Sequence, residues 1–376
     1  MKERIYVLLG GTGPIGIHLT KALEKTPNTR IFVTSRKRHE STDKVTYLRG
    51  NAKDLGFLRK TIFDLKEKCG SIDVVVDFMV WSNEDFGTVI RLLLPNTNKY
   101  VYLSSSRTFA DTKGNLIKED SPKWLDVATD KKFLRTDGYA IPKAQQEKML
   151  QSSGFDNFLI IRPYITYAEN RLPLGSLEKE IWLYRVLHGR TLVFSEDVAN
   201  HYTSLMYGKD VADSMCNLII NDSVPRDTVN VTFSESLKWR EVLTIYSNVL
   251  KQHYPKVKIK MIPNSIKAGG GDYQTIYDRM VDRRFDSSKL AHYVDETAFT
   301  HMKEGLEKCL EANIKHFNYN TSLQDWRLQA LLDRTTHEYA SYNEFPKFKT
   351  FLKYMVYRTT PKSVVKIYRI IKSKIK

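Results

Sequence analysis

The chain has 376 residues, which suits a large domain with a smaller partner and excludes a peptide or a small disulfide scaffold. Hydrophobic residues make up 41% and charged residues 27%, enough for a hydrophobic core and too balanced for a disordered protein. The three cysteines (Cys69, Cys216, Cys309) form no close pair, which excludes a cysteine-based zinc site and indicates a reducing, cytoplasmic compartment. We expect no metal.

The formal net charge of +16 is concentrated at the C-terminus. Residues 344–376 contain ten lysines or arginines and one acidic residue. Such a stretch favours contact with an anionic surface, such as a membrane or nucleic acid. No apolar run approaches 18 residues and the first strand begins almost at Met1, so neither a signal peptide nor a spanning helix is expected. We therefore expect a protein that is soluble or peripheral at the inner membrane face.

Apolar runs alternate with segments of helical periodicity through the first 163 residues. Strands that are apolar on both faces indicate a parallel sheet covered by helices, so the fold class is α/β, a Rossmann-type doubly wound sheet. We expect residues 1–163 to form this domain, with segments near 190–235 returning to it, and residues 164–320 to form mainly a smaller α/β substrate lobe. The predicted strands are Ile5–Leu9, Ile31–Thr34, Val45–Leu48, Asp73–Met79, Tyr100–Leu103 and Phe158–Arg162, and the predicted helices include Leu55–Lys66, Thr88–Leu94 and Tyr139–Gln151.

A glycine-rich turn follows the first strand. Gly10, Gly13 and Gly16 stand at the spacing of a dinucleotide-binding turn, and Pro14 and Ile15 open the next helix. In such a turn one glycine allows the tight bend, one lets the backbone approach a pyrophosphate, and one lets the helix pack on the strand. A turn used only for packing is the alternative. A P-loop is excluded because no Gly-Lys-Ser/Thr follows.

The end of the second strand indicates which dinucleotide would bind. The strand ends at Ser35 and Arg36, where an acidic residue would hold the adenosine ribose of NAD. A guanidinium suits a 2′-phosphate, so the sequence favours NADP, with NAD as the alternative. A solvated basic turn would leave the same pattern. Asn51 and Ala52, after the third strand, are placed to meet the adenine.

One Tyr-x-x-x-Lys pattern stands where a sheet presents catalytic side chains. Tyr139 opens a helix that follows the strand ending in Ser104-Ser105-Ser106, and Lys143 lies one helical turn later. The ammonium would lower the phenol pKa from ~10 and hold the nicotinamide ribose, and Ser106 would bind the same substrate oxygen. A surface pair is the alternative for the other two occurrences, Tyr254/Lys258 and Tyr368/Lys372.

These motifs resemble the extended short-chain dehydrogenases/reductases, the NAD(P)-dependent sugar epimerases and dehydratases. The resemblance implies that Tyr139 is the acid/base, Lys143 its partner and Ser106 the third member, with Phe78, Met79 and Pro163 beside the cofactor. It covers about residues 3 to 315. The matching segments are Gly10–Gly16, Asp73–Met79, Tyr102–Ser106, Tyr139–Lys143, Arg162–Pro163, Lys209–Ala212 and Arg284–Lys289.

The sequence departs from that family at three places. Dehydratases of the family carry Asp-Glu after the serine, and here Arg107 and Thr108 follow Ser106, which argues against a 4,6-dehydratase. Two usual diphosphate contacts, an asparagine and an arginine, are replaced by Ile165 and Thr203. The side chains that could substitute are Arg171, Lys209, Arg283 and Arg284.

Residues 321–376 are expected to form a basic amphipathic helical extension. Thr360 and Pro361 predict the start of its last helix, where apolar residues recur at helical spacing opposite lysines. The segment 345–376 would dock on an anionic membrane surface or a partner enzyme. Packing on the protein's own body is the alternative.

The sequence thus supports an NAD(P)-dependent epimerase or keto-reductase acting on an activated, nucleotide-linked sugar, in surface polysaccharide synthesis. The alternative is a non-catalytic protein of the same fold that binds RNA or a partner through its basic surface. A binding-only protein has no need to keep Ser106, Tyr139 and Lys143 together, so we favour the enzyme and do not expect nucleic-acid binding. A homodimer is left open.

Overall fold

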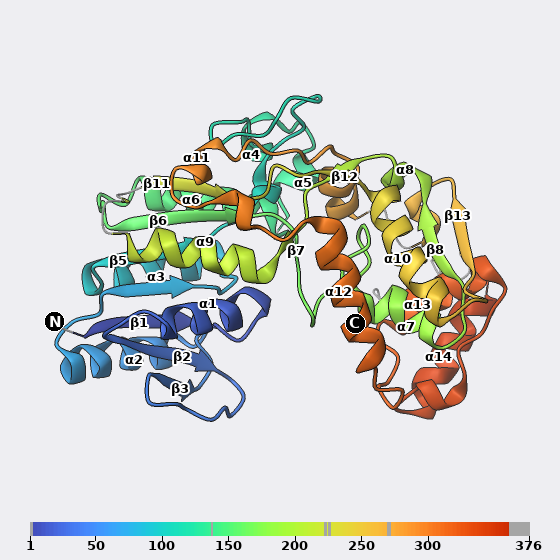
Figure 1. Ribbon diagram of the computed structural model, residues 1–376, viewed down its shortest axis with the longest axis horizontal. Helices are drawn as coiled ribbons and strands as arrows, with labels where there is room; N and C mark the ends of the chain where they lie inside the picture. The colour runs from blue at the N-terminus through green and yellow to red at the C-terminus, as the bar shows by residue number, and fades with distance from the viewer. Residues whose placement is uncertain (1–2, 137, 222–223, 225–226, 269–271, 361–376) are drawn as a thin grey trace, which may run out of the picture. The chain divides into compact units, whose positions relative to one another are not determined.

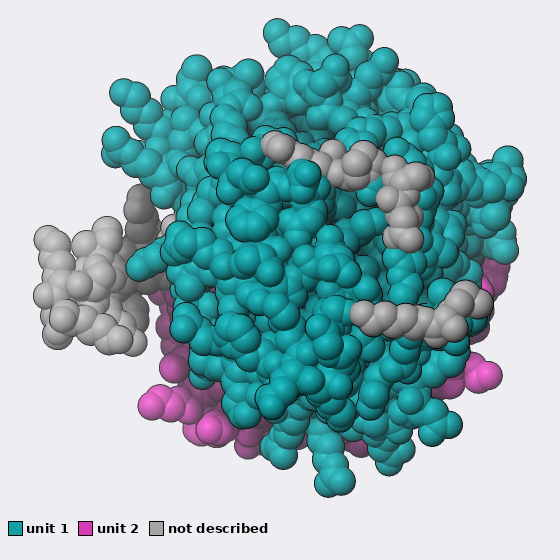
Figure 2. Space-filling view, turned by 90° about the vertical axis from the view of Figure 1, so that its left-hand side faces the viewer, with its two compact units in different colours: residues 1–170, 204–236, 282–305 teal, residues 171–203, 237–281, 306–376 magenta. Residues whose placement is uncertain are grey.

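A computed structural model describes residues 3–136, 138–221, 224, 227–268 and 272–360 (Figure 1). The chain divides into two compact units, coloured separately in Figure 2. Unit 1 comprises Met1–Asn170, Ser204–Ser236 and Asp282–Gly305, and unit 2 comprises Arg171–Thr203, Leu237–Val281 and Leu306–Lys376.

Unit 1 is built on a seven-stranded, entirely parallel sheet in the order β11-β6-β5-β4-β1-β2-β3. This arrangement confirms the predicted α/β doubly wound class, and the strand order reverses between β1 and β4. The strands are β1 (Arg4–Leu9), β2 (Thr29–Ser35), β3 (Val45–Arg49), β4 (Val74–Asp77), β5 (Lys99–Leu103), β6 (Phe158–Pro163) and β11 (Asp227–Val231). A separate parallel pair joins β7 (Thr166–Tyr167) and β10 (Met206–Tyr207).

Helices cover both faces of this sheet, which explains why its central strands β1, β4, β5 and β6 are mostly apolar and buried. Tyr6 and Leu8 of β1 pack into one core with α1 and α9, whereas Val7 and Leu9 pack into the other with α2, α3 and α6. The helices are α1 (Pro14–Glu24), α2 (Leu55–Cys69), α3 (Asn83–Leu93), α4 (Trp124–Val127), α5 (Lys131–Leu134), α6 (Ala140–Gln151), α9 (Gly208–Ile220) and α11 (Ser288–Ala291).

Two of the predicted boundaries differ from the structure for reasons that local hydrogen bonds explain. The strand predicted over Asp73–Met79 ends at Asp77, because the Asp77 carboxylate accepts a hydrogen bond from the Met79 N–H at 2.8 Å and turns the chain. The helix predicted from Thr88 begins at Asn83, because Ser82 caps it by accepting from the Asp85 N–H at 3.1 Å.

Unit 2 is mainly helical. Its two small sheets pair β9 (Tyr202–Thr203) with β12 (Leu237–Lys238) and β8 (Leu192–Ser195) with β13 (Ile259–Ile262). Its helices are α7 (Lys179–Leu187), α8 (Glu196–Ala199), α10 (Trp239–His253), α13 (Trp326–Thr336) and α14 (Phe348–Thr359), and α12 (Met302–Lys315) belongs partly to each unit. The short 3₁₀ turns of the chain are Leu94–Asn96, Ser106–Thr108, Ser265–Ala268, Glu296–Ala298 and Tyr342–Glu344, and a π turn spans Thr275–Arg279.

The C-terminal helix of the described chain ends next to a proline. α14 stops at Thr359, and Thr360 has extended backbone (φ −79°, ψ 135°). Proline disfavours the helical conformation in the residue before it, which explains the break. The helix predicted to begin at Pro361 lies outside the described residues. None of the described helices is long and apolar enough to cross a membrane.

Candidate functional site

The glycine turn lies between β1 and α1, where the strand order reverses. Gly10 has a φ of +74°, and its N–H donates to Thr34 Oγ1 of β2 at 2.9 Å. A Cβ on Gly10 would lie 2.6 Å from Met79 Sδ, and one on Gly16 would lie 2.5 Å from the Gly11 carbonyl oxygen. Side chains at both positions would therefore collide, so these glycines serve the turn and the packing of α1.

Gly13 has a different reason to be glycine. A Cβ at Gly13 would meet nothing within 4 Å, and its φ of −84° is open to any residue. Gly13 is the N-cap of α1, with Pro14 at the first helical position. The space in front of it faces a helix N-terminus at the switch point of a doubly wound sheet, which is where a dinucleotide pyrophosphate binds in such folds.

The predicted adenosine contacts differ in how they are placed. Ser35 ends β2 buried, and its Oγ lies 3.0 Å from His39 Nε2, whereas Arg36 is exposed. Asn51 is exposed and its Oδ1 accepts from the Lys53 N–H at 3.2 Å. Ala52 is buried in the core beneath α2. Arg36 and Asn51 are thus exposed near the ends of β2 and β3.

Lys143 is the most unusual ionisable group of unit 1. Its side chain is buried, and Nζ donates to the Leu103 carbonyl at 2.6 Å, at the end of β5. The ammonium lies 4.4 Å from the centroid of the Tyr102 ring and 5.8 Å from that of Tyr139. Burial lowers the pKa of Lys143 to about 8, although the nearby Asp77 carboxylate opposes the shift.

Two cations lie near the ring of Tyr139. This residue is half-buried at the start of α6, with Lys143 Nζ 5.8 Å and the Arg107 guanidinium 5.1 Å from its ring centroid. Ser106 is buried on the loop after β5, and its hydroxyl donates to the Arg162 carbonyl at 2.9 Å. The structure therefore brings Tyr139, Lys143 and Arg107 together. Positive charge near a phenol stabilises its phenolate form.

The remaining predicted cofactor residues lie along the same sheet edge. Phe78 and Met79 follow β4 directly, and the Met79 carbonyl accepts from Lys143 Nζ at 3.5 Å. Pro163 is the buried last residue of β6. Ile15 lies in the first turn of α1, partly buried against the core of that face. These residues therefore end or follow β1, β4 and β6, the strands around the glycine turn and Lys143.

Asp77 supports this edge, although the sequence pattern predicts it only as part of an apolar strand. Its Oδ2 accepts from Tyr100 Oη and from Trp81 Nε1, each at 2.7 Å. Burial raises the pKa of Asp77, while these hydrogen bonds and the charge of Lys143 oppose the rise. The available signal was a single carboxylate closing a Val-Val-Val run, because a buried acid requires partners.

A second buried carboxylate, Glu147, holds α6 against β6. It accepts from Arg162 Nε and Nη2 at 2.8 Å each, from Lys123 Nζ at 2.6 Å and from Ser104 Oγ at 2.5 Å. Burial alone would raise the pKa of Glu147, but hydrogen bonds from Arg162 and Lys123 hold it below its usual value. The network fixes the helix that carries Tyr139 and Lys143.

The residues named as substitutes for the missing diphosphate contacts all have partners within the chain. Arg283 is fully buried and donates to the Phe109 carbonyl at 2.9 Å, and Arg284 donates to the Gly114 carbonyl. In unit 2, Arg171 pairs with Glu178 at 2.6 Å. Lys209 Nζ lies 2.6 Å from Asp213 Oδ2, in an exposed ion pair one turn apart on α9. Ile165 and Thr203, which replace the two usual diphosphate contacts, are both buried.

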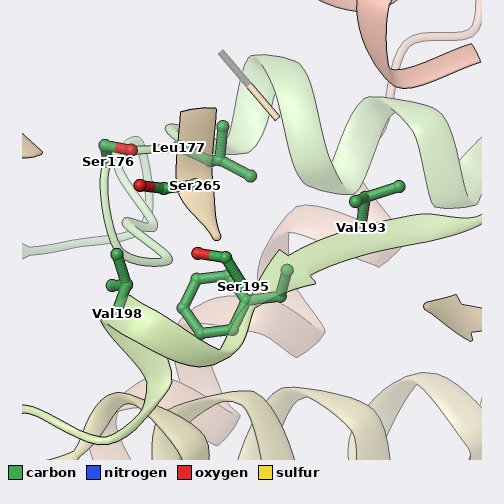
Figure 3. A pocket seen from close by; sticks show the side chains of 7 residues that line it. Ser176, Leu177, Val193, Ser195, Val198 and Ser265 are labelled. Carbon is green, nitrogen blue, oxygen red and sulfur yellow. The ribbon is translucent and has the colours of Figure 1, made fainter. Parts of the chain in front are cut away.

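Unit 2 contains a small pocket beside β8. Three serines line it with apolar neighbours (Figure 3), and Ser265 Oγ lies 3.0 Å from Asp197 Oδ2. It has room for about one water molecule, so a sugar does not fit in it. The lining residues are Ser176, Leu177, Val193, Phe194, Ser195, Val198 and Ser265. Among the residues that the structure describes, no group of three His, Cys, Asp or Glu could hold a metal ion.

Comparisons with known proteins agree on the fold. No family model and no curated protein matches the sequence. The chain is similar to a Bacillus cereus UDP-glucuronic acid 4-epimerase solved with UDP-glucuronic acid and NAD (TM-score 0.63, 14% identity, 84% of this chain and 100% of that chain). It is also similar to a dTDP-glucose 4,6-dehydratase from Bacillus anthracis solved with NAD (TM-score 0.61, 12% identity, 84% of this chain and 98% of that chain). A UDP-N-acetylglucosamine 4-epimerase from Methanobrevibacter ruminantium is similar as well (TM-score 0.60, 18% identity, 84% of this chain and 99% of that chain). The chain therefore has the fold of the extended short-chain dehydrogenases/reductases.

Proposed function

We propose that this protein is an NAD(P)-dependent epimerase or keto-reductase that acts on an activated, nucleotide-linked sugar. The observation that carries the proposal is Lys143, a buried ammonium hydrogen-bonded to the Leu103 carbonyl and adjacent to Tyr139. Burying a lysine without a carboxylate in direct contact is costly, and structural stability offers no reason for it. A proton-transfer site at the carboxyl edge of the sheet does give a reason to bury this lysine.

The chain's own residues would bind the dinucleotide and move the proton. Gly13 and the N-terminus of α1 would hold the pyrophosphate, and Arg36 the adenosine end. When bound, the nicotinamide would accept or supply the hydride. Tyr139 would take the proton from the sugar hydroxyl, or return it to the oxygen, while Lys143 and Arg107 stabilise its phenolate. Ser106 would orient the same oxygen.

Arg107 favours epimerisation or reduction over elimination of water. Elimination needs a carboxyl acid and a base close to the sugar, and the residue after Ser106 is an arginine whose guanidinium lies beside Tyr139. A cation at this place can stabilise the phenolate but cannot donate a proton to a leaving hydroxyl near neutral pH. We place the reaction in the cytoplasm, in surface polysaccharide synthesis.

The direct test is turnover. The purified protein, with NAD⁺ or NADP⁺ and then with the reduced forms, is incubated with UDP-, dTDP- and GDP-linked hexoses, and the products are separated by chromatography and identified by NMR. We expect an epimer or a reduced sugar from one of them. Binding of neither cofactor, measured by fluorescence titration, would contradict the proposal. Cofactor binding with release of water from the sugar would instead identify a dehydratase.

The cofactor preference is expected to depend on Arg36. The wild-type protein should bind NADPH more tightly than NADH, and Arg36→Ala should weaken NADPH by about tenfold, the effect of losing one exposed charge-assisted contact of ~1.5 kcal/mol, while NADH is unaffected. Fluorescence titration of both cofactors measures this. The neighbouring Lys37→Ala variant is the control and should bind both cofactors as wild type does. Equal affinities of the wild-type protein for NADPH and NADH would show that Arg36 is only a solvated residue.

The activity is expected to fall at alkaline pH. Lys143 has a pKa of about 8 and loses its proton above that value, which removes one of the two cations beside the Tyr139 ring. The phenol pKa then rises, so kcat/KM should decrease by about tenfold per unit above pH ~8. A profile of kcat/KM against pH measures this, with a check that the activity returns when the pH is brought back to neutral. A rate that keeps rising to pH ~10 would exclude a role for the protonated Lys143.

A further inference from the structure

The last helix that the structure describes is α14 (Figure 1), and it carries a stripe of large apolar side chains that are exposed to solvent. Phe348, Leu352 and Val356 recur at every fourth position, and they are 58%, 47% and 56% exposed. The Tyr342 ring, 6.0 Å from that of Phe348 and also exposed, extends the stripe. Scattered apolar residues are normal on a surface, whereas an aligned row on one helix marks an interaction site. We call these four residues the outer face of α14.

The opposite side of α14 is fixed within unit 2. Tyr354 is fully buried, its hydroxyl donates to Asp333 Oδ2 at 2.5 Å, and it accepts from the Ala340 N–H at 2.7 Å. Asp333 is in turn bonded by Arg185 at 2.6 Å and by Arg190 at 2.9 Å. Rotating the helix to cover the outer face would break this buried network, so the outer face remains directed outward.

The charged residues of α14 are all basic. Lys347, Lys349 and Lys353 are exposed on and beside α14. Residues 345–376 contain ten lysines or arginines and no acidic residue. Long cationic side chains beside an apolar and aromatic stripe are the pattern of helices that lie in the headgroup region of a bilayer.

We propose that the outer face of α14 docks on an anionic lipid bilayer, with Phe348, Leu352 and Val356 inserted among the acyl chains and the lysines on the lipid headgroups. The charge complementarity favours lipid over a second copy of this chain, because two such surfaces would repel each other. The inference is independent of the reaction catalysed.

The experiment is flotation of the full-length protein with vesicles of phosphatidylcholine, with and without phosphatidylglycerol. We expect binding to the anionic vesicles only, decreasing as salt rises. The variant Phe348→Ser/Leu352→Ser/Val356→Ser should bind at least about tenfold more weakly, because about half of each side chain is available for burial. The charge variant Lys349→Glu/Lys353→Glu should also bind the anionic vesicles about tenfold more weakly, which corresponds to ~1.4 kcal/mol of binding free energy.

Matched controls separate the outer face from general effects. Phe63→Ser and Ile266→Ser remove exposed apolar side chains elsewhere, and Lys251→Glu/Lys256→Glu makes the same charge change outside α14; all should bind like wild type. Circular dichroism and melting temperature confirm folding of each variant. The proposal is overturned if the wild-type protein does not bind anionic vesicles or if the serine variant binds them as wild type does. It is also overturned if binding is abolished only by deleting residues 361–376, or if the serine substitutions alter the oligomeric state and leave vesicle binding unchanged.

Discussion

Replacing Tyr139 with phenylalanine should reduce kcat/KM for the sugar substrate by about 10²- to 10⁴-fold, the loss usual for a positioned acid/base. The ring that lies near Arg107 and Lys143 is retained, and only the proton-carrying hydroxyl is removed. Binding of the dinucleotide should therefore change by no more than about twofold. Steady-state kinetics and a cofactor titration on the same preparation measure the two effects.

The matched control is Tyr254→Phe, which removes the hydroxyl of another Tyr-x-x-x-Lys pair. Tyr254 Oη lies 3.4 Å from Tyr319 Oη in unit 2 and has no place in the proposed chemistry. Its activity should equal that of wild type. If Tyr139→Phe turned over the substrate at the parental rate, the acid/base would be another group, and the surroundings of Lys143 would need a different explanation.

Replacing Glu147 with glutamine should destabilise the protein by about 3–5 kcal/mol. The amide keeps the volume of the side chain but leaves the buried Arg162 without its bidentate counter-charge, now held at 2.8 Å by two hydrogen bonds. The pKa of Glu147 is below its usual value of 4.5. Its contribution is therefore present above pH ~4.5 and is lost as the pH falls through the folded-state pKa. Urea unfolding at pH ~7 measures the loss.

The control for this prediction is Asp64→Asn on α2, which breaks the exposed pair Lys60–Asp64 and should cost no more than ~0.5 kcal/mol. The difference in free energy of unfolding between wild type and Glu147→Gln should also be smaller at pH ~3 than at pH ~7. A Glu147→Gln variant as stable as wild type at neutral pH would mean that the network is held by its neutral hydrogen bonds rather than by charge.

The sheet of unit 1 could be predicted because its strands obey a simple rule. β1, β2, β5 and β6 are buried along most of their length and are therefore short, largely apolar runs, whereas β3 at the sheet edge is only partly buried. The observed bounds of these five strands differ from the predicted ones by two residues or fewer. The glycine turn followed from spacing. Where a hydrogen bond rather than an apolar pattern sets the boundary, as at Asp77 and Ser82, the prediction was wrong.

The surroundings of the candidate site could be predicted only in part. The pairing of Tyr139 with Lys143 follows from helical spacing, but the approach of Arg107 depends on the course of residues 109–138, which no periodicity specifies. The partners of Glu147 come from the residue after β5, from β6 and from the segment before α4. In unit 2, Arg185 and Asp333 are 148 residues apart. Such pairs carry no local sequence signal.

The alternation of the chain between its two units limits how this protein can be taken apart or recombined. Each unit consists of three separate stretches of sequence, so the polypeptide passes from one unit to the other five times. A gene fragment ending at Asn170 would omit α9, which packs on α1, and β11, which pairs with β6. It would carry an unprotected sheet edge and an uncovered apolar face. Neither unit is a transferable module, and exchange of substrate specificity between relatives of this architecture must proceed by side-chain replacement rather than by swapping whole domains.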